Sequence, residues 1–250
     1  MYKNILITGA SKGIGEYLAR NYAAKGVNLF LCARNHKDLE SVKIECDKLN
    51  ANTYIKSIDV TNKDALKEWI NEILKDHQID LVIANAGIGI SSGPDGEVEE
   101  QCRTIFDVNL YGVLNTLLPI IPYFKDKKKG QIAIISSLAA FRGLPSCPSY
   151  SASKAAVKSY GEALRGELYE YNVGVTVVCP GYIRTAMTES NKFPMPFLMD
   201  VDKASNIIAR RLEKNPSRIA FPFIMYFAVW FISIFPPSLT DILFRNLPKK

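Results

Sequence analysis

Short apolar segments alternate with helix-length segments along most of this 250-residue chain. The apolar segments contain few polar residues, which is typical of strands that are buried on both faces of a parallel sheet. Repeated units of strand and helix therefore predict an α/β fold with a doubly wound, mostly parallel, Rossmann-like sheet and helices on both faces. The predicted strands cover residues 3–9, 28–33, 53–59, 79–87, 130–137 and 174–181, and the predicted helices cover 14–25, 37–49, 62–77, 99–125, 150–172 and 202–214.

The composition favours a single globular domain over residues 1–250, with a content of 48% hydrophobic residues that is enough for a sizeable core. Five cysteines lie far apart without the C-x-x-C spacing of zinc or redox sites, so we expect reduced thiols in the cytoplasm. The net charge of +6 is modest, and its densest element, residues 125–130, is typical of a solvated helix end, so no nucleic acid is expected as a partner. We expect no secretory signal at the N-terminus. We also expect no metal site, because neither His36 nor His77 has a second ligand at a suitable spacing.

The segment ITGASKGIG at residues 7–15 has two incompatible interpretations. Its G-x-S-x-G pattern is that of a hydrolase nucleophile elbow, with Ser11 as the nucleophile. Such an elbow needs an oxyanion loop after an earlier strand and a histidine after a late strand, whereas both histidines of this chain lie in its first third. Gly9, Gly13 and Gly15 instead fit a turn that closes a strand and opens a helix, whose free N–H groups attract a phosphate. The context favours the phosphate-binding turn.

A second group of residues is suited to proton transfer. Ser137 follows the fifth predicted strand, Tyr150 lies thirteen residues later at the start of a predicted helix, and Lys154 lies one turn beyond Tyr150. The spacing of i to i+4 puts Tyr150 and Lys154 on the same face of that helix. A free phenol titrates near pH 10, roughly, and an adjacent ammonium favours the phenolate, so we predict that Lys154 lowers the pKa of Tyr150.

With these residues, several motifs make the chain resemble the short-chain dehydrogenase/reductase family in its compact single-domain form. The resemblance covers roughly residues 3–215, and its small departures are Ala84 and Ala140, neither of which replaces a reacting group. The motifs are TGASKGIG at 8–15, DVT at 59–61, ANAG at 84–87, VNLYG at 108–112, YSASK at 150–154 and PGYIRT at 180–185.

The resemblance implies a role for each reacting residue. Tyr150 would be the general acid for carbonyl reduction and the general base for alcohol oxidation, and Ser137 would hydrogen-bond the substrate oxygen where negative charge develops. Lys154 would hold the nicotinamide ribose, and Asn109 would secure a water in the proton relay behind Lys154. Taken singly, each residue also has an ordinary structural interpretation, such as a turn serine or a buried asparagine with a local partner.

The same resemblance implies a set of cofactor-binding residues along the carboxyl ends of the strands. The glycines and the proline among them could also simply form turns. The set comprises Gly9, Ser11, Lys12, Gly13, Ile14, Gly15, Arg34, Asp59, Val60, Asn85, Ala86, Gly87, Tyr150, Lys154, Pro180, Gly181, Ile183 and Thr185.

The charge at the end of the second predicted strand indicates which cofactor binds. An NAD site would have an acidic residue there to bind the ribose diol, but this chain has Ala33 and Arg34. Arg34 and Lys12 together favour the 2′-phosphate of NADP, and the nearest acid, Asp38, is expected further on as a helix cap. We therefore expect NADP(H), with NAD(H) as the less favoured alternative, and Asp59 near the adenine ring by resemblance.

The chain is expected to end in an apolar helical extension, residues 219–250, which has four interpretations. It can cover the substrate pocket or join subunits, as is common in the family; it can attach peripherally to a membrane; it can span one; or it can form a core helix. Residues 219–235 are the most apolar part of the chain, and Arg245, Lys249 and Lys250 lie near its end. The first two interpretations both favour a lipophilic substrate.

The loop at residues 186–200 is rich in methionine and aromatic residues. Flexible thioethers and aromatic rings suit a mobile cover over an apolar substrate. The alternative for this loop is a small satellite core.

We therefore expect an NADP(H)-dependent oxidoreductase that interconverts a carbonyl and an alcohol on a lipophilic small molecule, and by resemblance a homodimer or homotetramer. One alternative is a nucleotide-sensing or scaffold protein of the same fold with little turnover. The other is a membrane-attached enzyme with the same chemistry. A cytoplasmic location is expected, with membrane contact through residues 219–250 left open.

Overall fold

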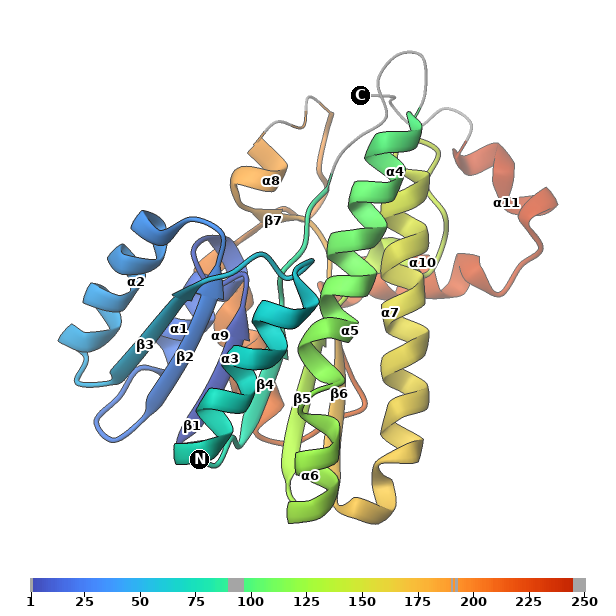
Figure 1. The fold of residues 1–250 in the computed structure, drawn as a ribbon. Helices are drawn as coiled ribbons and strands as arrows, with labels where there is room; N and C mark the ends of the chain where they lie inside the picture. Colours follow the sequence, from blue (N-terminus) through green and yellow to red (C-terminus); the bar gives the residue numbers. More distant parts are fainter. Residues whose placement is uncertain (1, 90–96, 190, 192, 245–250) are drawn as a thin grey trace.

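The protein contains a seven-stranded parallel sheet with helices on both faces (Figure 1). The computed structural model describes residues 2–89, 97–189, 191 and 193–244. The strand order is β3-β2-β1-β4-β5-β6-β9, so the chain crosses from one edge to the other half of the sheet between β3 and β4. The strands are β1 (Asn4–Thr8), β2 (Asn28–Ala33), β3 (Asn52–Ser57), β4 (Leu81–Ala84), β5 (Gly130–Ile135), β6 (Val173–Pro180) and β9 (Arg218–Phe221), with a separate short pair formed by β7 (Ile183–Arg184) and β8 (Met199–Asp200). This arrangement confirms the predicted doubly wound α/β fold.

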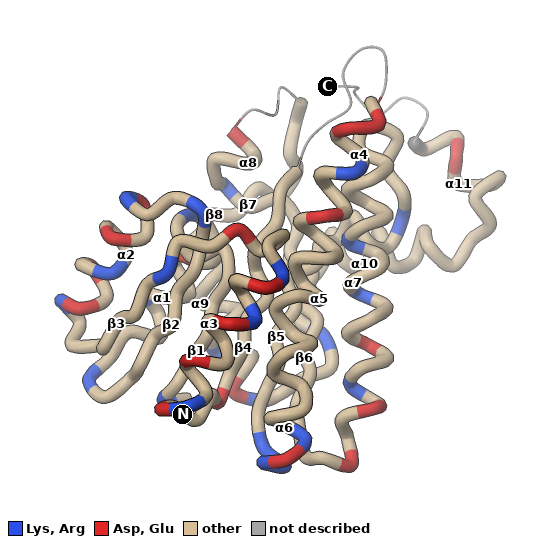
Figure 2. The backbone as a smooth tube through the Cα atoms, viewed as in Figure 1, with Lys and Arg blue, Asp and Glu red and all other residues tan. Residues whose placement is uncertain are grey.

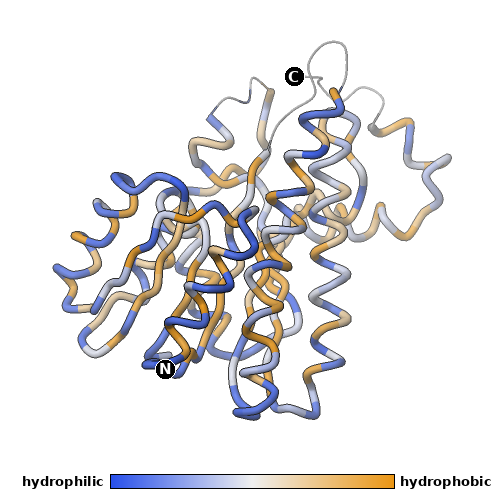
Figure 3. Tube along the Cα trace, viewed as in Figure 1, coloured by the Kyte–Doolittle hydropathy of each residue, from blue (hydrophilic) through white to orange (hydrophobic). Residues whose placement is uncertain are grey.

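Two layers of helices bury their apolar faces against the sheet. One layer contains α1 (Gly13–Tyr22), α2 (His36–Lys48) and α9 (Val201–Leu212). The other contains α3 (Lys63–Asp76), α5 (Gly112–Leu117), α6 (Ile121–Lys127) and α7 (Pro148–Glu167). The remaining helices are α4 (Glu99–Phe106), α8 (Ala186–Glu189), α10 (Phe223–Ser233) and α11 (Pro237–Phe244). Charged residues follow the outer sides of the helices (Figure 2), whereas hydrophobic residues fill the strands (Figure 3).

The structure corrects several predicted boundaries. The helix predicted over 99–125 is interrupted by a π-helical turn, Asp107–Tyr111, and by a second break before α6. The helix predicted over 150–172 begins at Pro148, whose fixed φ suits a first helical turn, and ends at Glu167. The first residues of the apolar C-terminal segment are not helical, because β9 pairs with β6 and adds a seventh strand to the sheet.

Helix α2 is capped differently from the prediction. Asn35 is its N-cap, and the Asn35 side chain accepts a hydrogen bond from the Asp38 N–H. Asn62 caps α3 in the same way through the Ala65 N–H. The prediction that Asp38 is a helix cap is therefore wrong, and the Asp38 carboxylate is available to another partner.

A ladder of amide side chains fixes the register of three neighbouring strands at their first residues. Asn4 pairs with Asn28 across β1 and β2, and Asn28 pairs with Asn52 across β2 and β3. The Asn28 side chain donates to Asn4 Oδ1 at 2.7 Å, and the Asn52 side chain donates to Asn28 Oδ1 at 2.9 Å. This ladder lies at the amino ends of the strands, opposite to their carboxyl ends.

The C-terminal helices α10 and α11 lie beyond β9, and α11 stands at the margin of the molecule (Figure 1). Helix α10 has 11 residues, whereas a helix needs about 20 to cross a bilayer, so α10 is too short to span a membrane alone. Among the described residues, only Glu99–Lys127 forms a helical stretch long and apolar enough for crossing, and half of its apolar window is buried inside the protein.

Candidate active site

The turn between β1 and α1 is shaped to approach a ligand with its backbone. Gly9 and Gly13 adopt φ values of +65° and +60°, which side chains disfavour. A Cβ at Gly9 would lie 2.7 Å from Ala86 Cα, so only glycine fits there. Lys12, the N-cap of α1, makes no capping hydrogen bond through its side chain. The first N–H groups of α1 are therefore not capped by that residue and can bind an anion such as a phosphate.

Hydrogen bonds join this turn to the end of β4 on the neighbouring strand. The Thr8 hydroxyl accepts from the N–H groups of Asn85 and Ala86 at 3.2 and 3.3 Å. The Asn85 side chain donates to the carbonyls of Thr8 and Gly9, both at 3.0 Å. β1 and β4 meet where the strand order reverses, which is where ligands bind in doubly wound sheets. Thr8 was not among the predicted site residues, although its place as the last residue of β1 before the glycine turn is a usable signal.

Two basic side chains lie near the ends of β1 and β2, and each is paired with a carboxylate. Lys12 Nζ lies 3.0 Å from Asp38 Oδ2, and Arg34 Nη1 lies 3.9 Å from Asp59 Oδ2. Both cations are mostly exposed, so either pair can reorganise around a ligand. The side chain of Val60, next to Asp59, is buried in the core, so only its backbone is available to a ligand.

The structure brings Ser137, Tyr150 and Lys154 together at the carboxyl end of β5. Tyr150 is the third residue of α7, and its hydroxyl hydrogen-bonds that of Ser137, which directly follows Ser136 at the end of the strand. Lys154 lies one turn further along and is buried, with its Nζ 3.0 Å from the carbonyl of Ile135 and 5.8 Å from the centre of the Tyr150 ring. Its ammonium therefore lies beneath the ring and is anchored to β5.

The pKa of Tyr150 moves in the direction opposite to the prediction. Burial raises the pKa of Tyr150 to about 12, and the hydrogen bond from Ser137 only partly offsets that effect. Burial also lowers the pKa of Lys154 to about 8, so the lysine itself is held less firmly in its charged form. The predicted lowering of the Tyr150 pKa by Lys154 is not found in this structure, because loss of solvent around the phenolate dominates the shift and the one contact that lowers the pKa is the hydrogen bond from Ser137.

Asn109 lies in the π-helical turn and is fully buried. Its side chain accepts from the Ile88 N–H at 2.8 Å and donates to the Ile88 carbonyl at 2.9 Å. It also donates to Ser153 Oγ at 3.1 Å, and that hydroxyl donates to the Tyr150 carbonyl. Asn109 thus ties the segment after β4 to the helix that carries Tyr150 and Lys154.

Some of the remaining predicted residues lie beside the reacting groups or the glycine turn, and others do not. A Cβ at Gly87 would lie 3.2 Å from both Asn109 Oδ1 and Lys154 Nζ, and a Cβ at Gly13 would lie 3.2 Å from Thr185 Cγ2. Gly87 and Thr185 therefore lie beside the reacting groups and the glycine turn, respectively. In contrast, the side chains of Ile14 and Ile183 pack into the core cluster on the α1 side of the sheet. Ser11 is partly exposed in the turn, and Gly15 lies close to Gly9 and Asn85. Pro180 is the last residue of β6, and Gly181, which follows it, lies beside Pro222 and Met225.

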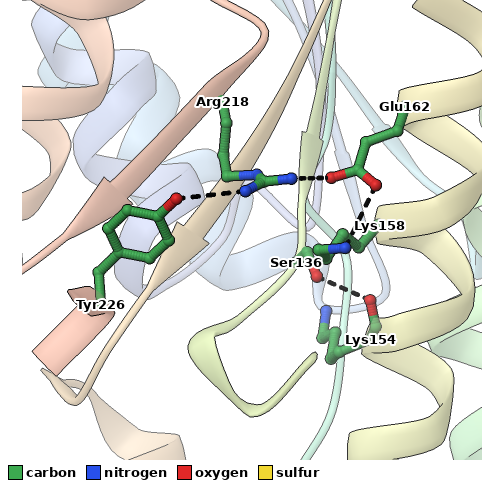
Figure 4. A network of polar contacts seen from close by, with 6 residues as sticks. All are labelled: Ser136, Lys154, Lys158, Glu162, Arg218 and Tyr226. Atoms are coloured by element: carbon green, nitrogen blue, oxygen red, sulfur yellow. Dashed lines mark hydrogen bonds and ion pairs between the residues drawn. The ribbon is translucent and has the colours of Figure 1, made fainter. Parts of the chain in front are cut away.

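A set of residues absent from the sequence predictions anchors the segment after Ser137. The Phe141 ring lies 5.1 Å from Lys158 Nζ and 5.2 Å from the Arg218 guanidinium carbon, and it meets the Tyr226 ring edge-on. Figure 4 shows Arg218 joining Glu162 of α7 to Tyr226 of α10. Partial burial raises the pKa of Glu162, but its hydrogen bonds with Arg218 and Lys158 outweigh this effect and leave that pKa below its usual value.

Figure 4 also shows how Lys154 is held from its backbone. The Ser136 hydroxyl donates to the Lys154 carbonyl at 2.8 Å, and the Lys154 ammonium donates to the Ile135 carbonyl. Two consecutive residues at the end of β5 therefore hold both the backbone and the side chain of Lys154. These partners come from distant parts of the chain, and no local pattern in the sequence identifies them.

Part of the loop predicted to cover the substrate, residues 186–200, lies near Tyr150. A Cβ at Gly89 would lie 3.1 Å from Met187 Sδ and 3.7 Å from Tyr150 Cε2, so Met187 approaches the phenol across Gly89. The Tyr182 ring meets the Phe193 ring edge-on at 6.1 Å. Residues 190 and 192 of this loop lie outside the described residues.

A cavity of about 590 Å³ lies next to the reacting groups but does not include them. It is bounded by residues 139–145 after Ser137, by Ser151, Ala152 and Ala155 of α7, and by Asp241 of α11. These residues of α7 lie on a different helix face from Tyr150 and Lys154. We therefore place the candidate site at Tyr150 and treat the cavity as a neighbouring space.

Known proteins resemble this chain over most of its length. A family model for short chain dehydrogenases matches residues 3–194. An uncharacterized oxidoreductase of Myxococcus xanthus is 34% identical over 247 residues, which cover 98% of each chain. A 3-ketodihydrosphingosine reductase of Bacteroides thetaiotaomicron is 32% identical over 187 residues, which cover 74% of this chain and 66% of that relative. A solved short-chain dehydrogenase from Sphingobium yanoikuyae in complex with NADPH has the same fold, with a TM-score of 0.82 and 23% identity over 98% of this chain and 96% of that one.

The sheet, the glycine turn and these relatives define a nucleotide-binding oxidoreductase. The chain belongs to the short-chain dehydrogenase/reductase family. The site fits the nicotinamide dinucleotide of this family. Gly9 leaves a space in the turn that a Cβ would fill, and the first N–H groups of α1 are not capped by the Lys12 side chain.

Proposed function

We propose that this enzyme reduces a lipophilic ketone or aldehyde to an alcohol with NADPH. The observation that carries the proposal is the meeting of Ser137, Tyr150 and Lys154 beside the glycine turn, with the Ser137 and Tyr150 hydroxyls hydrogen-bonded to each other. Two polar O–H groups at one point suit a carbonyl oxygen that gains negative charge during reduction.

Each of these side chains has a distinct task in the proposed reaction. When bound, the nicotinamide cofactor supplies the hydride that reaches the carbonyl carbon. Ser137 donates a hydrogen bond to the carbonyl oxygen, and Tyr150 transfers its hydroxyl proton to that oxygen as the C–O group becomes an alcohol. Lys154 binds the ribose hydroxyls of the cofactor, and Asn109 fixes the helix that carries both residues.

The charge state of Tyr150 supports reduction as the favoured direction. Because burial raises the pKa of Tyr150 to about 12, the phenol carries its proton at neutral pH and is ready to act as an acid. Alcohol oxidation needs the phenolate instead, which is scarce at that pH.

The preference for NADP(H) over NAD(H) is proposed from the charges at the adenosine end. Lys12 and Arg34 can both reach toward a 2′-phosphate, and no acid occupies the end of β2, where NAD-binding sites carry one. Asp38 and Asp59 partly neutralise these cations in the structure, so a 2′-phosphate would replace one anion by another.

A lipophilic substrate is supported by the side chains around Tyr150 and by one relative. Met187, Tyr182 and Phe193 lie on the segment that follows β6, and Met187 approaches Tyr150 across Gly89. The relative from Bacteroides thetaiotaomicron carries a name that denotes reduction of a long-chain keto lipid. We propose a carbonyl group on an aliphatic chain as the substrate class, and a cytoplasmic homodimer or homotetramer as the working form.

Replacement of the proposed acid tests this function. Tyr150→Phe should lower kcat for a panel of long-chain ketones and aldehydes about a thousandfold while leaving NADPH binding, followed by nicotinamide fluorescence, unchanged. Tyr169→Phe, which removes an exposed phenol elsewhere, is the matched control. NADPH binding without turnover of any carbonyl by the wild type would instead support a nucleotide-sensing protein.

A further inference from the structure

The C-terminal helices expose a continuous row of aromatic side chains. Phe223, Phe227, Phe231 and Phe235 follow one another at helical spacing along and just beyond α10, with exposed fractions of 72%, 51%, 49% and 42%. The centres of successive rings lie 6.3, 6.2 and 5.1 Å apart. We call these four residues the phenylalanine ladder.

The opposite side of α10 is fixed to the body of the protein. Met225, Tyr226 and Val229 pack against Leu138 and the cluster around it, beside the segment that follows Ser137. The ladder therefore faces away from the catalytic site because the other face of the same helix is already used.

Helix α11 also exposes apolar side chains. Leu239, Ile242 and Leu243 are exposed by 59% to 71%, although hydrophobic side chains of this size are normally buried in a soluble protein. Trp230, which contacts Phe227, and Ile234 widen the same surface on α10. Exposed apolar side chains in this number on two consecutive helices mark a place of interaction.

The segment that carries the phenylalanine ladder has no charged residue. Residues 219–240 contain no Asp, Glu, Lys or Arg, and Figure 2 shows α10 without charges. The next residue along the chain, Asp241, is paired with Arg142 at 2.6 Å. Basic residues follow directly, because Arg245, Lys249 and Lys250 lie within six residues of the end of α11 and the whole chain carries a net charge of +6.

We propose that the phenylalanine ladder and the exposed face of α11 bind the surface of a lipid bilayer that contains anionic lipids. The surface lacks charge over 22 consecutive residues and is followed along the chain by basic residues, which is the combination that peripheral membrane-binding segments present to anionic lipids. A helix of 11 residues with an aromatic face suits the headgroup region, where it lies along the membrane and does not cross it. The basic residues after α11 then meet anionic headgroups.

Docking in this way would place the cavity beside the bilayer. The cavity is bounded by Arg142 and Asp241, and the ion pair between them joins the segment after Ser137 to α11. A lipophilic substrate could then reach the enzyme from the lipid without passing through water. This consequence rests on the proposed function, whereas binding to the bilayer does not.

Flotation with lipid vesicles tests the proposal without substrate or cofactor. The full chain should float with vesicles of phosphatidylcholine and phosphatidylglycerol, and less with phosphatidylcholine alone. Phe227→Ser combined with Phe231→Ser should lower the partition coefficient about tenfold, because two exposed rings lose their apolar burial in the membrane. The matched control is Leu118→Ser combined with Tyr169→Ser, which removes two exposed apolar side chains outside this surface and should leave binding unchanged.

Tryptophan fluorescence of the unaltered protein gives a second measurement. The chain has two tryptophans, of which Trp69 is buried in the core and Trp230 lies on the proposed surface. Vesicles with brominated acyl chains should quench part of the emission, and Phe227→Ser with Phe231→Ser should remove that quenching while thermal unfolding stays unchanged. Absence of both flotation and quenching overturns the proposal, as does a dimer that dissociates in the double variant without vesicle binding. Such results do not contradict the proposed carbonyl reductase activity, because that activity is measured separately in detergent-free solution.

Discussion

The Lys12 ammonium lies 3.0 Å from the Asp38 carboxylate, so one of the two cations proposed to meet the 2′-phosphate of NADPH already has an anionic partner. A phosphate that binds Lys12 must compete with Asp38 for the same ammonium. The Asn35 cap leaves the Asp38 carboxylate free for this pairing, because α2 is capped without it.

Removal of the charge at Asp38 should therefore strengthen NADPH binding. We expect Asp38→Asn to lower the Kd for NADPH about twofold to fivefold, in the range of an exposed ion pair, and to leave the Kd for NADH unchanged. Fluorescence titration at fixed ionic strength measures both constants. Glu40→Gln, which removes a charge from the same helix, is the control, and equal gains for both cofactors would show that Lys12 does not meet the 2′-phosphate.

The raised pKa of Tyr150 predicts an asymmetric dependence of activity on pH. Below its pKa of about 12, the phenolate fraction of Tyr150 rises with pH, so alcohol oxidation should become faster with a logarithmic slope of about one between pH 8 and pH 10. Carbonyl reduction uses the protonated phenol and should not rise over that range. Steady-state rates in both directions measure this difference. A plateau of oxidation below pH 8 would show that the pKa of Tyr150 in the working enzyme is low, as the effect of Lys154 predicted from the sequence requires.

The contact between Phe141 and Arg218 predicts that Arg218 affects catalysis without touching the reacting groups. Arg218→Gln removes one of the two cations on the Phe141 ring and one of the two cationic partners of Glu162, so the segment that follows Ser137 loses part of its anchor. We expect kcat to fall about tenfold, because small displacements of a reacting group are costly, with the KM for NADPH unchanged.

Two comparisons separate this effect from general loss of an ion pair. Arg218→Lys keeps the charge and should restore most of the activity. Lys125→Gln also removes an ion pair and a cation–ring contact, to Glu167 and Tyr171, but it does so beside the start of β5, at the opposite end of that strand from Ser137, and it should leave kcat unchanged. If both glutamine variants have the same kcat as the wild type, Phe141 and Arg218 do not position Ser137.

Two glycines of α7 should respond to alanine in opposite directions. A Cβ at Gly161 would lie 2.6 Å from Val177 Cγ2 and 3.0 Å from Ile134 Cδ1, so Gly161→Ala should push α7 from the sheet and destabilise the fold by about 1–3 kcal/mol. A Cβ at Gly166 meets nothing within 4 Å, and Gly166→Ala should stabilise the helix by about 0.5–1 kcal/mol. Urea unfolding measures both, and a loss of stability in both variants would contradict the close packing at Gly161.

The sequence predicted those parts of the protein whose signals are local. β1, β2 and β5 are apolar runs, and the glycine turn and the i, i+4 pair of Tyr150 and Lys154 are visible without any tertiary information. The structure brings the glycine turn and the pair of Tyr150 and Lys154 together at the carboxyl ends of the strands, as the parallel topology requires.

Features that depend on distant contacts were not predictable in this way. β9 lies in the same apolar run as α10, and periodicity cannot separate a short strand from the helix that follows it. The sign of the Tyr150 pKa shift depends on how much solvent the fold removes, which spacing along a helix does not reveal. The anchors of Phe141 come from α7, β9 and α10, which only the folded chain assembles.

The asparagine ladder at the start of β1, β2 and β3 has a consequence for ligand choice at the other end of these strands. A slip of one residue between β1 and β2 would move Gly9 relative to Arg34 by about 3.3 Å and turn alternate side chains to the wrong face. The hydrogen bonds from Asn28 to Asn4 and from Asn52 to Asn28 oppose such a slip. The spacing between the turn proposed to bind the pyrophosphate and the basic residues proposed to bind the adenosine moiety is thus stabilised from one strand length away, by side chains at the opposite ends of the strands.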